Sequence, residues 1–129
     1  MNIFDFLNDE RGSATIEFVL WVPVFVVLLI ATVDASVLYL QHTEMWNVSR
    51  DVARRVTVGD LEYDKIDEAV KTKLFLASKN YILEISDPAE LDVTVKLQTS
   101  IKDASVFGFF KPVLGRYLTA EVTMRKEPY

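Results

Sequence analysis

The sequence has no cysteine and a single histidine, His42. The lack of cysteine excludes disulfides, thiolate metal sites and cysteine nucleophiles. One histidine cannot supply a His-rich metal site, and a Ser-His-Asp arrangement would depend on His42 alone. The four scattered glycines cannot form a Gly-rich phosphate-binding loop. We therefore expect no enzyme here, and no cofactor, metal site or small-molecule substrate.

Basic residues are also outnumbered. The 129 residues include 14 Lys and Arg against 19 Asp and Glu, which gives a formal net charge of -5. Nucleic acid rewards a basic surface, so this balance argues against a nucleic-acid partner. The length allows one globular domain at most.

The apolar residues are concentrated near the N-terminus. Residues 18–33 contain no charged side chain, and after Asp34 an uncharged stretch continues to Thr43. About 20 apolar residues in a helix cross the ~30 Å core of a bilayer. A buried helix of a soluble protein is the alternative, but only residues 44–129 remain to cover it. We expect a membrane-spanning helix over residues 13–43, with membrane lipid as a partner.

The residues that flank this run indicate whether the span is removed as a signal peptide and how it is oriented in the membrane. A cleavable secretory signal begins with basic residues and has a shorter apolar region, whereas residues 1–12 are acidic. The span is therefore expected to remain in the mature protein. Three arginines follow the run at positions 50, 54 and 55. Counting Lys and Arg alone would place the C-terminal part in the cytoplasm.

A glycine and a carboxylate lie at the start of the run. Gly12 is followed by four residues and then by Glu17, which is inside the beginning of the hydrophobic helix. A charge in a membrane segment is costly, although the cost falls near the interface. Glu17 could reach back to the interface, or it could be favoured by the positive end of the helix dipole.

This junction resembles the processing site of type IV prepilins. Gly12, four residues, then Glu17 and Phe18 before a hydrophobic stretch is closest to the tight-adherence (Flp) branch. The segment SATIEFVLWVPVF at 13–25, the ARR at 53–55 and the TAEVTMRKEP near the C-terminus are similar to TadE-like pseudopilins.

The resemblance implies a mechanism of maturation. A prepilin peptidase would cut between Gly12 and Ser13, so that residues 1–12 are a cytoplasmic leader. Glu17, next to Phe18, would then pair with the α-amino group of a neighbouring subunit and set the axial register. The expected partners are other pilin or pseudopilin subunits and the inner-membrane pilus assembly platform. The head, residues 44–129, would be periplasmic or carried on a surface pilus, an orientation that we prefer to the one from charge counting.

Two residues within the span leave alternatives open. Pro23 leaves the carbonyl of Val19 without its helical partner, so a kink is expected. It is either a tolerated membrane proline or a bend that helps the helix leave the bilayer for a filament. Asp34 lies ~25 Å beyond Glu17 along a helix. It either marks the outer membrane boundary or pairs with a cation of a partner subunit.

Beyond Thr43 the pattern predicts a small α+β head on a continuous spine. Apolar residues recur at helical spacing until Gly59-Asp60, so one helix is expected from Ser13 to Val58. A second helix is expected from Asp64 to Lys79-Asn80. Alternating residues predict an antiparallel sheet of two to three strands. The expected strands are 81–86, 91–101 and 118–125, with a break at Asp87-Pro88.

Residues 102–116, between the last two strands, are unusually apolar. Phe107, Phe109 and Phe110 are the prominent side chains, and Gly108 argues against regular structure. These aromatic residues either cap the core of the sheet or form an exposed patch for another pilin-like subunit or an assembly factor.

Two functions are consistent with these features. The first is a TadE-like minor pilin, processed by a prepilin peptidase and required for assembly of a tight-adherence pilus with roles in adhesion and secretion. The second is an unprocessed single-pass inner-membrane scaffold or adaptor of a secretion or pilus assembly machine.

Overall fold

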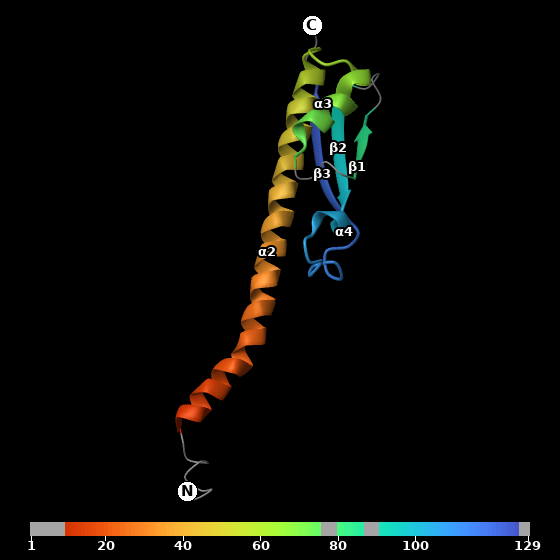
Figure 1. The fold of residues 1–129 in the computed structure, drawn as a ribbon. Helices are drawn as coiled ribbons and strands as arrows, with labels where there is room; N and C mark the ends of the chain where they lie inside the picture. The colour runs from red at the N-terminus through yellow and green to blue at the C-terminus, as the bar shows by residue number, and fades with distance from the viewer. Residues whose placement is uncertain (1–9, 76–79, 87–90, 127–129) are drawn as a thin grey trace, which may run out of the picture.

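A computed structural model describes residues 10–75, 80–86 and 91–126 of the chain. One long helix, α2, carries a small head near its C-terminal end (Figure 1). The elements in order are α2 (Glu10–Thr57), the 3₁₀ turn η1 (Tyr63–Lys65), α3 (Ile66–Lys73), β1 (Tyr81–Ile85), β2 (Asp92–Ser100), α4 (Ile101–Ala104) and β3 (Tyr117–Arg125). The α+β architecture predicted from the sequence, a helical spine with a small antiparallel head, is confirmed. Ala77, Lys79, Asp87, Pro88 and residues 1–9 of the expected leader lie outside the described residues.

The sheet has three antiparallel strands in the order β1-β2-β3. Val95 in the central strand lies opposite Ile85 on one side and Val122 on the other. Alternate side chains of β2 are buried, as the period-two pattern predicts. This apolar face packs against α2, so the head consists of one sheet layer and one helical layer.

The upper part of α2 presents an apolar stripe to the sheet. Its buried members are the residues that the helical spacing singled out: Met45, Val48, Ser49, Val52, Ala53 and Val56. They recur every three or four residues and therefore lie on one face. The helix ends at Thr57, and Gly59 follows with φ +74°, a left-handed conformation that glycine adopts without strain.

The second helix is shorter than predicted. It ends at Lys73, because Leu74 adopts an extended conformation and turns its side chain into the core. The backbone N–H of Phe75 then donates to Glu44 Oε1 on α2, at 2.6 Å. A tertiary hydrogen bond thus replaces the next helical one, which the local pattern could not show.

The expected irregular segment after β2 begins with a helical turn. Ile101, predicted to be the last strand residue, is the first residue of α4, and the Ser100 hydroxyl caps this turn by accepting from the N–H of Lys102 at 3.3 Å. Ile101 and Ala104 pack with Leu38 of α2 in a second, smaller core. This core lies below the sheet, towards the N-terminal part of α2 (Figure 1).

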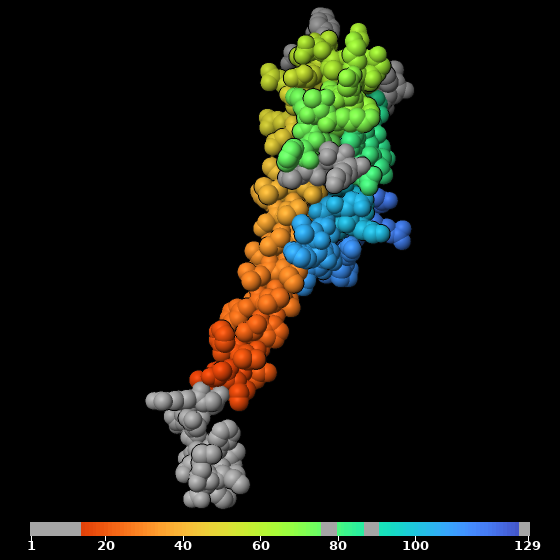
Figure 2. All heavy atoms as spheres, viewed as in Figure 1, coloured from red at the N-terminus to blue at the C-terminus, as the bar shows by residue number. Residues whose placement is uncertain are grey.

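The N-terminal part of α2 projects away from the head without covering. Every described side chain from Ala14 to Leu29 is exposed, and the first half-buried ones are Ile30 and Ala31. Figure 2 shows this part as a rod that extends beyond the head. Its axis bends in the red-to-orange part of Figure 1, the stretch of sequence that contains Pro23. The expected kink is explained by the missing N–H of proline.

Candidate functional site

The bare part of α2 has the dimensions of a membrane segment. Residues 14–29 rise about 24 Å, and the apolar sequence continues to Val33, which gives about 30 Å. Within the described residues, α2 is the one helix that is long and apolar enough to cross a membrane. The chain is therefore compatible with a single-pass membrane protein. The domain boundaries at 12 and 43 remain predictions.

The expected processing junction lies at the free end of this rod. The backbone of Gly12 and Ser13 belongs to the first turns of α2, while the side chain of Ser13 lies outside the described set. Glu17 and Phe18 are exposed. Within the described part of the chain, Glu17 has no ion-pair partner. The structure thus places Glu17 close to the junction, five residues or about 7.5 Å along the helix, and leaves its carboxylate available.

Asp34 binds the loop after α4, a role that neither sequence alternative included. Its side chain is completely buried, although it belongs to the apolar run. Oδ1 accepts the N–H groups of Val106 at 2.9 Å and Phe107 at 2.8 Å, and Oδ2 accepts the N–H of Phe109 at 2.6 Å. A buried carboxylate needs such donors, and here three backbone groups of the same chain satisfy it.

The conformation of this loop depends on Gly108. Its φ is +74°, and it lies among the three residues whose N–H groups converge on Asp34. Backbone that alternates between right- and left-handed conformations forms such concave anion-binding nests. A Cβ at Gly108 would come within 2.7 Å of Lys111 Cε and would also be strained by the positive φ.

Two further side chains of α2 hold the same end of the head. Gln41 Nε2 donates to the carbonyl of Ala104 at 3.0 Å in a buried position. Nε2 of His42 lies 3.2 Å from the carbonyl oxygen of Thr119 on β3. His42 is thus a partly buried contact between α2 and the sheet. Within the described ranges, no group of three or more His, Asp or Glu could hold a metal ion.

Of the three phenylalanines of the loop, one caps a core and two form an exposed patch, the two roles that the sequence left open. Phe110 is half-buried and packs on the small core of Leu38, Ile101 and Ala104. Phe107 and Phe109 are exposed, with 60% and 43% of their surface accessible. The loop therefore caps a core with one ring and presents two. The loop is bound to Asp34, which lies ~25 Å beyond Glu17 along α2. The junction and the loop are therefore separate sites.

The hydroxyl of Tyr81 on β1 connects the sheet to α3, where its partner Asp67 also forms an ion pair within the helix. Tyr81 Oη donates to Asp67 Oδ1 at 2.9 Å, and Lys71 Nζ lies 2.5 Å from Asp67 Oδ2. Burial and the neighbouring carboxylate of Asp67 raise the pKa of Tyr81 to about 12. The lysine and the tyrosine hydroxyl lower the pKa of Asp67 in return.

Sequence reasoning missed the contact between Asp34 and the loop, but a signal for it exists. Asp34 precedes Leu38, Gln41 and Met45 by four, seven and eleven residues, so it shares their helix face. That stripe packs on the head, which means that an acid at its lower end must meet backbone donors or another partner. The donors themselves were not identifiable, because they lie more than 70 residues away.

Comparisons with known proteins address the N-terminal part of the chain. The family described as TadE-like protein matches residues 12–54. No curated protein and no solved structure matches the chain significantly. The match begins at Gly12 and covers the bare rod together with most of the helix under the sheet. Residues 12–54 of this chain are TadE-like, which confirms the resemblance drawn from the sequence.

Proposed function

We propose that the protein is a TadE-like minor pilin, which a prepilin peptidase cuts between Gly12 and Ser13 and which helps to assemble a tight-adherence pilus with roles in adhesion and secretion. The observation that carries the proposal is the family match, which starts at Gly12. The bare apolar rod supports it, because a helix that is exposed along its whole circumference needs lipid or neighbouring helices to cover it.

Glu17 has a defined part in this proposal. Its carboxylate is exposed on the apolar rod and has no ion pair with the described residues. In a membrane or a bundle of helices such a charge requires a partner from another molecule. The α-amino group released at Ser13 of a neighbouring subunit is a cation at the same end of the rod. Pairing of the two groups would fix how far adjacent helices are displaced along their axes.

The cleavage is tested by intact-mass measurement of the protein extracted from its native membrane. We expect the mature chain to begin at Ser13 and the Gly12→Ala variant to keep its leader. Ser36→Ala is the control, because it changes one small residue at an exposed position of α2 that is far from the junction. An uncut wild-type chain, or normal processing of Gly12→Ala, would contradict the proposal.

The role of Glu17 is tested separately from the cleavage. Glu17→Ala should be processed normally but should reduce the number of surface pili seen by electron microscopy. Glu121→Ala removes an equal charge from an exposed position of β3 and should leave piliation unchanged. Normal piliation in the Glu17→Ala variant would remove the register role.

One structural feature favours the second candidate, an unprocessed single-pass scaffold or adaptor. The helix α2 continues without interruption from Glu10 through Gly12 and Ser13. A peptide bond within a helix must unwind before a protease can bind it in an extended form. Gly12 lowers this cost, because glycine is about 1 kcal/mol less favourable than alanine in a helix. The mature N-terminus distinguishes the two candidates: Met1 for the scaffold and Ser13 for the pilin.

A further inference from the structure

One end of the head faces the expected membrane. The segment 105–116, here called the lower loop, lies with α4 at the end of the head nearer to the bare rod (Figure 1). Asp34 binds this loop only five residues beyond Leu29, about 7.5 Å along α2. If residues 14–33 cross the bilayer, the lower loop is the part of the head at the membrane surface.

The lower loop exposes many apolar side chains to the surroundings. Over its length the large apolar residues that are at least 40% exposed are Val106, Phe107, Phe109, Val113 and Leu114. Val113 reaches 77%. Such a concentration is unusual for a solvated loop and marks a contact with another apolar phase. Figure 2 shows the segment that contains this loop, in blue, beside the orange part of α2 from which the rod extends.

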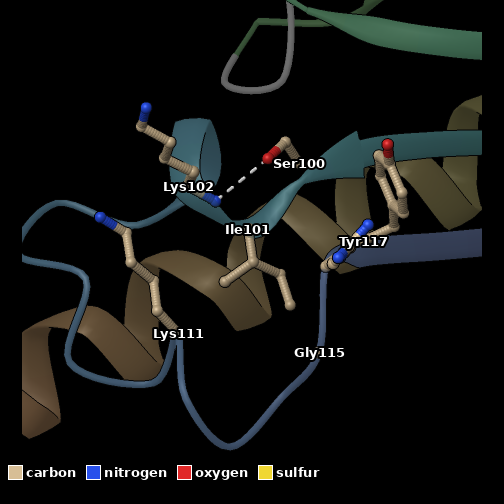
Figure 3. Close-up of a pocket in the computed structure, with 7 residues that line it drawn as sticks. Ser100, Ile101, Lys102, Lys111, Gly115 and Tyr117 are labelled. Atoms are coloured by element: carbon tan, nitrogen blue, oxygen red, sulfur yellow. Dashed lines mark hydrogen bonds between the residues drawn. The ribbon is translucent and has the colours of Figure 1, made fainter.

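A basic pocket lies beside these apolar residues. Its volume is about 230 Å³, and its lining includes Lys102 of α4, Lys111 of the loop and Arg116 before β3. Figure 3 shows both lysine side chains on one side of Ile101, with Tyr117 on the other. The lining contains no acidic residue, whereas the whole chain has a net charge of -5. The pocket is thus a local cluster of positive charge at the end of the head nearer to the rod.

We propose that the lower loop is an interfacial anchor, whose apolar side chains enter the outer surface of the bilayer while the pocket of Lys102, Lys111 and Arg116 binds the phosphate of an anionic phospholipid. The combination fits lipid, because exposed Phe, Val and Leu side chains bury at the boundary of headgroups and acyl chains, and basic side chains beside them attract anionic headgroups. Asp34 serves the anchor by holding the loop at this depth. The proposal rests on the membrane span of the proposed function but not on cleavage.

The depth of the loop can be measured with chains that contain one tryptophan. The native tryptophans are Trp21 in the rod and Trp46. Phe107→Trp is made with both of these changed to Phe, and Val58→Trp, at the opposite end of the head, is made in the same way. Each full-length chain is placed in phosphatidylcholine vesicles whose acyl chains carry bromine, which quenches nearby indoles. We expect strong quenching for Phe107→Trp and little for Val58→Trp.

A third chain that keeps only Trp21 distinguishes a failure of the membrane span from a failure of the interfacial anchor. If Trp21 is not quenched, the rod does not span the bilayer, and the span in the proposed function is wrong. If Trp21 is quenched but Phe107→Trp resembles Val58→Trp, the span stands and the anchor is overturned. The exposed rings would then be left for a protein partner, which is the alternative occupant.

The pocket is tested by adding phosphatidylglycerol to the vesicles. We expect the added anionic lipid to increase quenching of the Phe107→Trp chain at least twofold over phosphatidylcholine alone. Lys111→Gln with Arg116→Gln should abolish the increase. Arg50→Gln with Arg54→Gln removes the same charge from α2 beneath the sheet and should retain it. Equal behaviour of the two pairs, or no increase with anionic lipid, would overturn the headgroup site.

Discussion

Asp34 determines how the lower end of the head is attached to the spine. Its carboxylate is buried, although it lies next to an apolar run. Burying a carboxylate without hydrogen-bond partners would be unfavourable. Three backbone N–H groups of the lower loop compensate for its burial. Hydrogen bonds to an ionised group contribute about 1.5–3 kcal/mol each, so this one side chain can order the loop.

Replacing Asp34 with Asn tests this contact. The amide nitrogen would face a backbone N–H in place of an acceptor oxygen, so at least one bond is lost. We expect the N–H groups of Val106, Phe107 and Phe109 to exchange roughly a hundredfold faster, equivalent to about 3 kcal/mol. Hydrogen–deuterium exchange in detergent measures this. Asp103→Asn, at an exposed position of α4, should leave these rates unchanged, and unaltered protection in Asp34→Asn would contradict the role.

Tyr81 predicts how stability responds to alkaline pH. Its folded pKa is raised to about 12, above the ordinary value of 10.0. The neutral hydroxyl is therefore favoured in the folded state, and the stability it contributes is complete below pH 10 and is lost as the pH rises towards 12.

Denaturant unfolding in detergent at several pH values checks this dependence. The free energy of unfolding of wild type should fall more steeply between pH 10 and 12 than that of Tyr81→Phe. Tyr117→Phe, which changes an exposed tyrosine, should follow wild type. Parallel curves for wild type and Tyr81→Phe would show that the hydroxyl is not linked to folding.

At the scale of elements, α2 is one helix with two environments. Its lower part has an apolar surface on all sides, which only lipid or other helices can cover. Its upper part is amphipathic and forms half of the head's core. The stripe that faces the head changes character along its length, from Asp34 and Gln41 against irregular backbone to Met45 and Val52 against the sheet. Asp34 and Gln41 lie where the opposing backbone is irregular and offers free groups, whereas Ser49 is a buried polar residue among the apolar ones that face the sheet.

The two environments predict effects of very different size for the same kind of truncation. Met45→Ala removes a fully buried side chain and should lower the head's free energy of unfolding by about 2–5 kcal/mol. Leu28→Ala, on the bare part of α2, should change it by less than about 0.5 kcal/mol. Denaturant unfolding monitored by near-ultraviolet circular dichroism compares them. Equal effects would mean that the bare part contributes to the head's core.

At the scale of the whole molecule, the head and the rod have separate requirements. In the described chain every buried residue lies at position 34 or beyond, so the rod contributes nothing to the head's core. The described side chains of the bare rod are all exposed, and its apolar surface is suited to a membrane or a bundle of subunits.

A chain shortened to residues 30–129 tests this separation. It keeps Asp34, both cores and the whole sheet, and we expect it to be folded and recoverable without detergent. Circular dichroism and the exchange protection of β2 would show the fold. Recovery only as unfolded or aggregated protein would mean that the rod is required for the head.

Much of this molecule was predictable because its main signals are local. The stripe from Met45 to Val56, the strand of residues 92–100 and the apolar run depend on spacing over a few residues, and the structure has them where they were expected. The spacing of Asp51 and Arg55, four residues apart on a helix, likewise predicts an ion pair, which the structure has at 3.1 Å. The predicted length of α3 was wrong, because a hydrogen bond to Glu44 from Phe75 takes the place of the next helical turn. The prediction of a strand through Ile101 was also wrong, because Ile101 packs against Leu38 in the small core.

The sequence alone determined that the chain has a long apolar-then-amphipathic helix and a small sheet, because period and length are properties of neighbouring residues. It also contained the junction at Gly12 and Glu17, since that is a linear motif. Only the tertiary structure decided what Asp34 binds and which rings of the lower loop remain exposed. Those outcomes depend on how β2 and β3 dock on α2, which brings residue 34 within hydrogen-bond distance of residues 106, 107 and 109.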